Sequence, residues 1–265
     1  MEKMALVYGE VTNQMQTVLK DLCLKGFLHD YRECPFTHSN MDLVKYFELD
    51  KDKINKILRK QQIINEYVII KGNVHTDDFL RGVIKLNKEL GGDRLIHCAN
   101  FYNPNTEQEF IMTDGACNLA LDDELRTKAI EYATKISYVK KPKQKEVWTS
   151  LITAGGDYNN KTDSELYDWW LKHKEDYPEN SLRLEQLDVA LSSDIRLVKK
   201  TPGRVADVIV VKDINVGNAI WKSLTVLGCW QCYGILMGSP VPIVLNSRGD
   251  SADSIIGSIK LAIQL

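Results

Sequence analysis

Hydrophobic residues follow two patterns along the chain: in some segments they recur at helical spacing, and in others they form short unbroken runs typical of buried strands. Residues 67–70 (Tyr-Val-Ile-Ile) form a continuous apolar run, as expected of a parallel strand covered on both faces. Within 11–25 and 77–90, apolar residues instead recur at helical spacing. The pattern predicts strands at 5–8, 27–33, 67–70, 94–102, 109–113, 147–153, 181–189, 205–211, 233–237 and 243–245. It predicts helices at 11–25, 41–61, 77–90, 122–137, 163–174, 215–227 and 252–265.

Strands that alternate with helices of this length indicate βαβ units. The expected fold class is therefore α/β, two-lobed, with mostly parallel sheets and flanking helices. Two candidate hinges, the basic stretch 140–145 and Gly238-Ser239-Pro240, predict a first lobe of residues 1–141 and 240–265 and a second of 142–239. Ligands of open α/β sheets bind beyond the carboxyl ends of strands, so the chemistry is expected in the strand-to-helix loops.

Composition narrows the classes of protein. The 265 residues include 34 Lys and Arg against 36 Asp and Glu, and 44% are hydrophobic, as in ordinary soluble proteins. A formal charge of −2 argues against a broad nucleic-acid surface. No apolar run approaches the ~20 residues that cross a bilayer, so no membrane partner is expected. Six scattered cysteines favour reduced thiols and a cytoplasmic location.

The loop that follows the strand at 67–70 is the first candidate site. Gly72 is expected to let the backbone turn sharply, and Thr76 or Asp77 to cap the next helix. Arg81 lies about one helical turn further, from where its planar guanidinium can reach back and hold two phosphate oxygens. Taken alone, the loop favours the plainer interpretation of a capped helix that carries a solvated arginine.

The loop before the last predicted helix has anion-binding chemistry. Free N–H groups and the positive end of a helix dipole make such a turn a natural anion site. Ser247 adds a hydroxyl, Arg248 a fixed cation, and Gly249 room for an oxyanion to approach the backbone. Asp250 or Ser251 is the expected helix cap.

Two further loops carry weaker signals. Asp114-Gly115 follows a strand and is turn chemistry in any fold. Asn218 belongs to a helix start (213–218) whose small and amide side chains can pack close to a ligand, although an N-cap by Asp213 or Asn215 explains that start equally. The histidines show no metal-ligand spacing, and the C-x-x-C pair Cys229 and Cys232 has no second pair to complete a zinc site, so no metal site is predicted.

Five segments, taken in order, resemble motifs of the phosphate acetyl/butyryl transferase family, most closely its phosphate butyryltransferase (branched-chain phosphotransacylase) branch. They are 71–81 (Lys-Gly-Asn-Val-His-Thr, then Leu-Arg), 110–118, 188–192 (Asp-Val-Ala-Leu-Ser), 205–218 and 241–251 (Val-Pro-Ile-Val-Leu-Asn-Ser-Arg-Gly-Asp-Ser). The chain departs from the family pattern at 155–162, at 183–187 and at Lys212.

The resemblance implies a fold, a reaction and partners. It implies an isocitrate/isopropylmalate dehydrogenase-like architecture with a cleft between two lobes. The implied reaction is reversible transfer of a short or branched-chain, butyryl-like acyl group between coenzyme A and inorganic phosphate. Coenzyme A is then a co-substrate, no metal or redox cofactor is needed, and the expected assembly is a homodimer.

The resemblance also implies roles for site residues. Arg81 and Arg248 are expected to grip the phosphoryl group together, and Ser247 to hydrogen-bond phosphate or the carbonyl oxygen. Asp250 is the hypothetical general base, with Asp253 or Ser254 as alternatives one turn further along. The expected substrate-binding residues are Gly72, His75, Thr76, Asp114, Asn218, Gly249 and Ser251.

Two other classes stay open at this point. A metal-dependent decarboxylating dehydrogenase shares the two-lobed architecture, but it needs clustered acidic metal ligands that the sequence does not show in a convincing pattern. The departure at 183–187 is also compatible with a non-catalytic protein that binds acyl-CoA or acyl phosphate.

Overall fold

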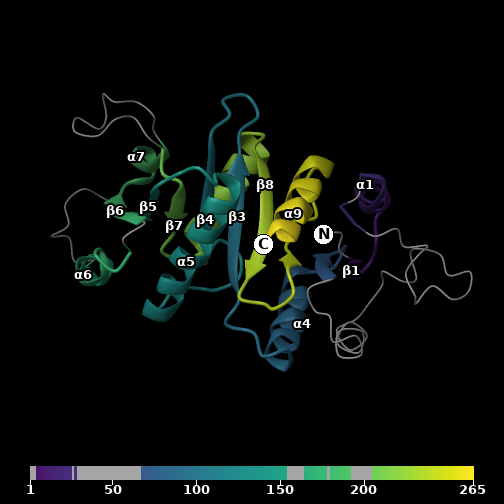
Figure 1. The fold of residues 1–265 in the computed structure, drawn as a ribbon, viewed down its shortest axis with the longest axis horizontal. Coiled ribbons are helices and arrows are strands. Elements are labelled where there is room, and N and C mark those ends of the chain that lie inside the picture. Colours follow the sequence, from purple (N-terminus) through teal and green to yellow (C-terminus); the bar gives the residue numbers. More distant parts are fainter. Residues whose placement is uncertain (1–3, 26, 29–66, 154–163, 178–179, 192–204) are drawn as a thin grey trace, which may run out of the picture. The chain divides into compact units, whose positions relative to one another are not determined.

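The computed structural model describes residues 4–25, 27–28, 67–153, 164–177, 180–191 and 205–265. Backbone contacts divide the chain into two compact units (Figure 1). Unit 1 comprises Met1–His97 and Gln231–Leu265, and unit 2 comprises Cys98–Trp230.

Unit 1 is built on a short, mostly parallel set of strands in the order β1-β2-β9-β8. These are β1 (Met4–Tyr8), β2 (Tyr67–Lys71), β9 (Ile243–Val244) and β8 (Gln231–Met237). β1, β2 and β9 run parallel, and β8 is antiparallel to β9. Every residue of β2 is buried, which explains its unbroken apolar sequence.

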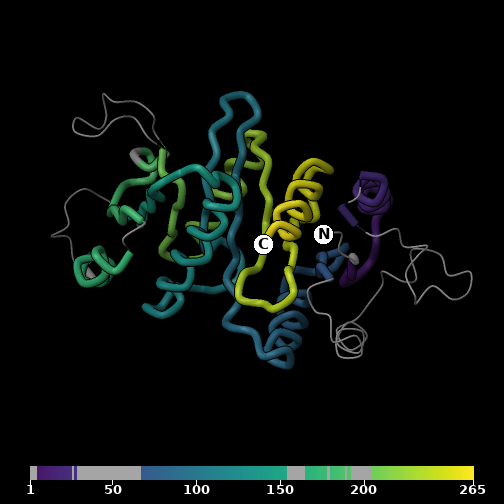
Figure 2. The backbone as a smooth tube through the Cα atoms, viewed as in Figure 1, coloured from purple at the N-terminus to yellow at the C-terminus, as the bar shows by residue number. Residues whose placement is uncertain are grey.

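Three helices begin just beyond the parallel strands of unit 1. They are α1 (Asn13–Leu24), α4 (Thr76–Glu89) and α9 (Ala252–Gln264). α9 lies along β8 (Figure 1), and the first helix (purple) and the last (yellow) lie side by side in Figure 2. α4 packs through Phe79, whose ring forms a T-shaped pair with the ring of Tyr8 from β1, with 5.4 Å between the ring centroids.

Unit 2 has the strand order β3-β4-β7-β5-β6. The strands are β3 (Ile96–Tyr102, its first two residues in unit 1), β4 (Glu109–Thr113), β7 (Val208–Val210), β5 (Val147–Ile152) and β6 (Asn180–Glu185). β3 and β4 form an antiparallel pair, and the other neighbours are parallel. The helices are α5 (Asp123–Lys140), α6 (Ser164–His173), α7 (Leu187–Leu191) and α8 (Ile214–Lys222), which continues as a π-helical segment, Ser223–Leu227.

The α/β class with mostly parallel strands and flanking helices is confirmed, and two element predictions need correction. The strand expected at 181–189 ends at Glu185, because the N–H of Ala190 turns to the carbonyl of Gln186 and begins α7. The helix expected at 215–227 is α-helical only to Lys222. The predicted helix 41–61 and residues 29–33 of a predicted strand lie outside the described residues.

The contact units do not share the boundaries of the predicted lobes. Residues 98–141 belong to unit 2, because β4 pairs with β7 and α5 packs on both strands. Residues 231–239 belong to unit 1, because β8 pairs with β9 and packs on α9. The domain division drawn from the sequence, and the cleft implied with it, stay predictions.

Buried serines attach α9 to β8. The Ser258 hydroxyl accepts a hydrogen bond from the Gly234 N–H at 3.1 Å and donates to the Ser254 carbonyl at 2.7 Å. The Ser254 hydroxyl accepts from the Cys232 N–H at 3.2 Å. These contacts provide hydrogen-bond acceptors for buried N–H groups of β8.

We therefore expect Ser258→Ala to lower the free energy of unfolding by about 1–3 kcal/mol, because it strands the N–H of Gly234. Ser223→Ala, at an exposed position, should change it by less than about 0.5 kcal/mol. Chemical denaturation of both variants measures the difference. Equal stabilities would show that the Ser258 hydrogen bond contributes nothing to unit 1.

Candidate active site

Three strand-to-helix loops of unit 1 meet at the carboxyl ends of β1, β2 and β9. The loop after β1 joins the loop after β2 through Asn73, whose N–H and side-chain amide donate to the carbonyl and carboxylate of Glu10 at 2.7 and 2.8 Å. At the start of α1, Gln14 donates to the carbonyl of Asp250, in the loop after β9, at 3.2 Å. Hydrogen bonds between chain segments far apart in sequence thus hold the loops together.

Of the three helices that start at this edge, two are capped by hydroxyl groups. Thr12 caps α1 and Ser251 caps α9. The N-cap of α4 is His75, whose side chain makes no capping hydrogen bond. The expectation that Thr76 or Asp77 caps α4 is wrong, since both lie inside the helix, and Ser251 rather than Asp250 is the cap of α9. The N–H groups that begin α4 are therefore not used by its own cap.

The two glycines expected at the site have different surroundings. A Cβ at Gly72 would lie 2.5 Å from the carbonyl oxygen of Glu10, so Gly72 allows the first two loops to approach closely. Its backbone does not adopt the positive φ of a sharp glycine turn. A Cβ at Gly249 would meet nothing within 4 Å, so the space above its backbone is open, as anion approach requires.

Both predicted arginines lie against the first turn of α4. The guanidinium Nη2 of Arg248 lies 3.4 Å from Nδ1 of His75, which must accept because a guanidinium only donates. Arg81 reaches back over its own helix, where Nε donates to the carbonyl of Asp77 and Nη2 pairs with Asp78, each at 3.3 Å. The Arg81 side chain is 76% exposed, and so open an ion pair holds it only weakly. That the two guanidinium groups grip one phosphoryl group stays a prediction.

Asp250 closes the loop between β9 and α9. Its Oδ2 accepts from the backbone N–H of Ser247 at 2.7 Å, and its own N–H donates to the Ser247 carbonyl at 3.1 Å. This reciprocal pair fixes the turn that carries Arg248 and Gly249, both of which are exposed. The role of Asp250 as a general base stays a prediction.

Lys71, the first residue of the 71–81 segment, lies at the same edge, although the sequence assigned it no role in the site. It is the last residue of β2 and only 2% exposed, and its Nζ lies 3.4 Å from the carbonyl of Gly72. Burial lowers the pKa of the Lys71 ammonium from its ordinary value, and the positive charge of Arg248 lowers that pKa further, whereas the Asp250 carboxylate opposes the shift. The sequence signal that could have identified Lys71 is its position at the end of the otherwise apolar run 67–70.

The remaining predicted substrate-binding residues, Asp114 and Asn218, lie in unit 2. Asp114 is 1% exposed, and its carboxylate accepts from the N–H groups of Ala116 and Cys117 and from the side chain of Asn118, at 2.7–2.9 Å. These bonds close the turn itself. Asn218 is an exposed residue of α8. Their roles in substrate binding stay predictions.

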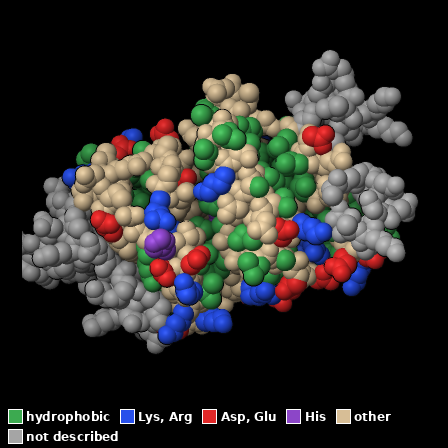
Figure 3. All heavy atoms as spheres, turned by 180° about the vertical axis from the view of Figure 1, so that it is seen from behind, with side chains coloured by type: hydrophobic (Ala, Val, Ile, Leu, Met, Phe, Trp, Pro, Cys, Tyr) green, Lys and Arg blue, Asp and Glu red, His purple; other side chains and the backbone are tan. Residues whose placement is uncertain are grey.

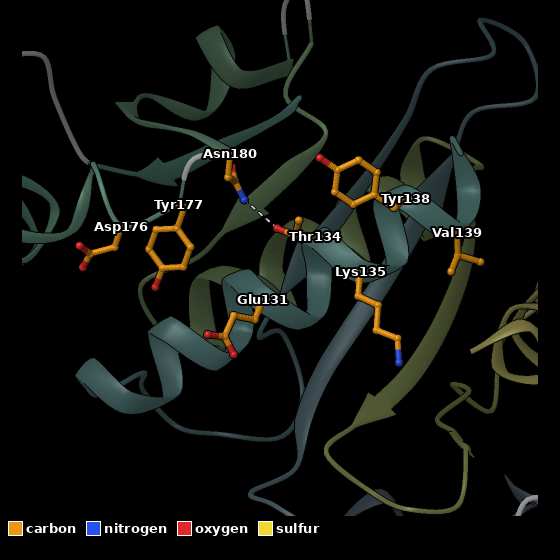
Figure 4. Close-up of a pocket in the computed structure, with 8 residues that line it drawn as sticks. All are labelled: Glu131, Thr134, Lys135, Tyr138, Val139, Asp176, Tyr177 and Asn180. Carbon is orange, nitrogen blue, oxygen red and sulfur yellow. Dashed lines mark hydrogen bonds between the residues drawn. The ribbon is translucent and has the colours of Figure 1, made fainter. Parts of the chain in front are cut away.

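A separate pocket of about 690 Å³ lies in unit 2, between α5 and the segment that leads into β6 (Figure 4). Its wall combines the tyrosines Tyr138 and Tyr177 with the carboxylates of Glu131 and Asp176. Burial raises the pKa of Tyr177 from its ordinary value. None of the predicted site residues lines this pocket.

Surface charge and hydropathy add two observations. On the face drawn in Figure 3, lysine and arginine side chains lie among aspartates and glutamates. Within the described ranges, none of the helices is both long enough and apolar enough for a membrane span.

The fold and the three joined loops define an α/β protein that gathers basic side chains at the carboxyl ends of parallel strands. Residues 181–263 match the family described as "Phosphate acetyl/butaryl transferase". A phosphate butyryltransferase of Clostridium acetobutylicum is 30% identical over 208 residues, which cover 74% of this chain and 67% of that protein. A phosphate acetyltransferase of Rickettsia felis is 27% identical over 243 residues, 89% of this chain and 66% of that protein.

The chain belongs to the phosphate acetyl/butyryl transferase family, which confirms the resemblance found in its motifs. The aligned part spans about two thirds of the length of these curated relatives.

Solved structures show the same fold. A branched-chain phosphotransacylase from Enterococcus faecalis superposes with a TM-score of 0.73 at 22% identity, covering 99% of this chain and 98% of that one. A beta-decarboxylating dehydrogenase from Thermococcus kodakarensis gives a TM-score of 0.54 at 14% identity, covering 99% and 82%. The expected likeness to dehydrogenases of the isocitrate type is thereby confirmed for the fold.

The lowered pKa of Lys71 predicts how stability changes with pH. Between that pKa and the unfolded value of 10.5, the unfolded chain binds the additional proton, so stability rises with pH. Below the folded pKa the buried charge opposes folding in full. We therefore expect Lys71→Met to be more stable than the wild type at pH 7, with a gap that narrows as pH approaches 10.5.

Denaturant titrations at several pH values measure this gap, with Lys88→Met, at an exposed position of α4, as the control that should show little change. A wild type more stable than Lys71→Met at neutral pH would contradict the assignment of Lys71 as an uncompensated buried charge.

Proposed function

We propose that the protein catalyses reversible transfer of a short or branched-chain acyl group between coenzyme A and inorganic phosphate. Membership of the family and the names of its relatives support this reaction. The observation that carries the proposal is the position of Arg248, in a turn fixed by Asp250, beside the uncapped start of α4.

The site suits an anionic substrate. Phosphate and acyl phosphate carry oxygens that a guanidinium fork can bind two at a time. N–H groups at the start of α4 and the helix dipole add a fixed positive potential, and Gly249 leaves the backbone open to close approach. In this proposal Arg248 holds the phosphoryl group and the Ser247 hydroxyl hydrogen-bonds it or the carbonyl oxygen. The Arg81 guanidinium leaves Asp78 and binds the same phosphoryl group.

The same groups can lower the barrier to acyl transfer. The thiol of coenzyme A loses its proton and attacks the acyl carbon, so a carbon–sulfur bond forms as the bond to the phosphate oxygen breaks. Negative charge develops first on the carbonyl oxygen and then on the leaving phosphate. Donors already in place at these oxygens stabilise the transition state more than the ground state, which is the condition for catalysis.

Deprotonation of the thiol requires a base, and Asp250 is our candidate. A carboxylate near pKa ~3.9 is a weak base for a thiol near ~8.5, so proton transfer would have to accompany carbon–sulfur bond formation. Asp253, exposed in the first turn of α9, is the alternative.

Acyl preference and assembly are further parts of the proposal. A butyryl-like substrate is our first choice, because the relative named above that is 30% identical is a phosphate butyryltransferase. A homodimer is supported by the exposed apolar side chains Val226 (68%) and Leu227 (81%) in unit 2. We expect no metal or redox cofactor, and the cytoplasmic location stays a prediction.

Arg248→Ala tests the proposed phosphoryl contact. Because Arg248 is exposed, the variant should fold normally, while phosphate-dependent release of thiol from butyryl-CoA falls by about 100- to 1,000-fold. Arg248→Lys, which keeps the charge and loses the planar fork, should fall less. Unchanged turnover in Arg248→Ala would remove the assigned role.

Wild-type behaviour separates the other candidate functions. Binding of acyl-CoA without release of thiol would favour a non-catalytic binding protein. Reduction of NAD with a hydroxy acid and Mg²⁺ would favour a dehydrogenase.

Asp250→Asn tests the general base. An asparagine side-chain oxygen can still accept from the N–H of Ser247, so the turn should persist while proton transfer is lost. We expect at least a 100-fold lower kcat, with Asp253→Asn near wild-type turnover. The reverse order would assign the base to Asp253, and full activity of both variants would exclude either carboxylate.

A further inference from the structure

Lys71 is the only lysine or arginine that is buried among the described residues. The two buried aspartates are fully engaged: Asp207 accepts from Lys141 at 2.8 Å and from the N–H of Trp148 at 3.0 Å, and Asp114 accepts three hydrogen bonds. Lys71, in contrast, has a single long contact with the Gly72 carbonyl, 3.4 Å from Nζ, and no carboxylate of the described residues within ion-pair distance. A buried ammonium so poorly paired is costly.

The surroundings of Lys71 make that cost larger. Lys71 ends β2, and Arg248 follows the parallel neighbour β9, so two cations lie at adjacent strand ends. Burial and, after it, the Arg248 charge both lower the pKa of the Lys71 amine. Asp250, the nearby carboxylate, already accepts from the N–H of Ser247. An anion that binds between the buried Lys71 and the exposed Arg248 would reduce their mutual repulsion.

An anion that contacts Lys71 must reach it from solvent, on the open side of the same loops. His75 and Arg248 are exposed, and the space above Gly249 is empty within 4 Å. The first turn of α4, which has no side-chain cap, starts five residues after Lys71. The loop after β2 thus carries Lys71 and leads into the uncapped start of α4. The neighbouring loop after β9 carries Arg248 and the open backbone at Gly249.

We propose that Lys71 is a second resident cation of the anion site, and that its ammonium donates a hydrogen bond to a phosphoryl oxygen of the phosphate or acyl phosphate that Arg248 binds. This inference rests on the proposed function for the identity of the anion. Lys71 forms no covalent bond. As the carbon–oxygen bond breaks, charge grows on the leaving phosphate, and the hydrogen bond from Lys71 strengthens.

The proposal links phosphate binding to a proton. The groups that act on the Lys71 amine are Arg248, which disfavours the protonated form, and Asp250, which favours it. The other ionisable groups of the adjoining loops are Glu10, after β1, and His75, after β2. A bound anion adds negative charge beside the amine and raises its proton affinity, so binding should draw a proton from solvent whenever the free amine is partly neutral.

Calorimetric titration with inorganic phosphate alone, at fixed ionic strength, tests the inference without any turnover. Lys71→Met should bind phosphate about 10- to 100-fold more weakly than the wild type, the usual loss for a hydrogen bond to a charged group. Lys71→Arg should recover part of this affinity, and the exposed control Lys88→Met should stay within about twofold. In buffers of different ionisation enthalpy, the wild type should show proton uptake that Lys71→Met lacks.

Kinetics supply the second readout. In Lys71→Met, the KM for phosphate should rise while the KM for acyl-CoA stays constant, a split that a merely structural role would not produce. Denaturant unfolding confirms that each variant is folded.

The outcomes separate this inference from the proposed function. Phosphate binding that depends on Lys71, in a protein without thiol release, would support the anion site and overturn the transferase. Normal phosphate affinity and KM in Lys71→Met, in an active enzyme, would overturn the role of Lys71 and leave the transferase intact. A wild type that neither binds phosphate nor releases thiol would overturn both.

Discussion

The site depends on one constraint, the hydrogen bonds that hold three strand-to-helix loops together at the carboxyl ends of β1, β2 and β9. Asn73 joins the first loop to the second, and Gln14 joins the start of α1 to the third. Parallel strands bring their carboxyl ends to one edge, so charges carried by distant parts of the sequence become neighbours there.

Two features at this edge are unfavourable for the stability of the free protein. A lysine is buried next to a guanidinium, and α4 starts without a side-chain cap. Each feature costs folding free energy, and in our proposal a bound anion offsets that cost. α1 and α9, which start at the same edge, have hydroxyl caps that bond their first-turn N–H groups. That contrast within one unit is why we propose the phosphate site at the start of α4.

Local sequence predicted the elements well where one signal dominates, as in the unbroken apolar run of β2 and the apolar helical spacing of α4. It also predicted the loops that carry Arg248 and His75, because strand-turn-helix order is readable from the chain. It assigned no role to Lys71, since a lysine at a strand end is usually solvated and its burial is seen only in the coordinates. It misplaced the cap of α4, and the turn-closing hydrogen bonds of Asp114 require coordinates to be seen.

A crystal structure of the protein grown with inorganic phosphate would show whether Arg248 and Lys71 bind the same anion. We expect a phosphate ion in unit 1, with oxygens within hydrogen-bond distance of the Arg248 guanidinium and the Lys71 amine, at the start of α4. Phosphate bound only elsewhere, with the Lys71 amine still on the Gly72 carbonyl and Arg248 still beside His75, would contradict it.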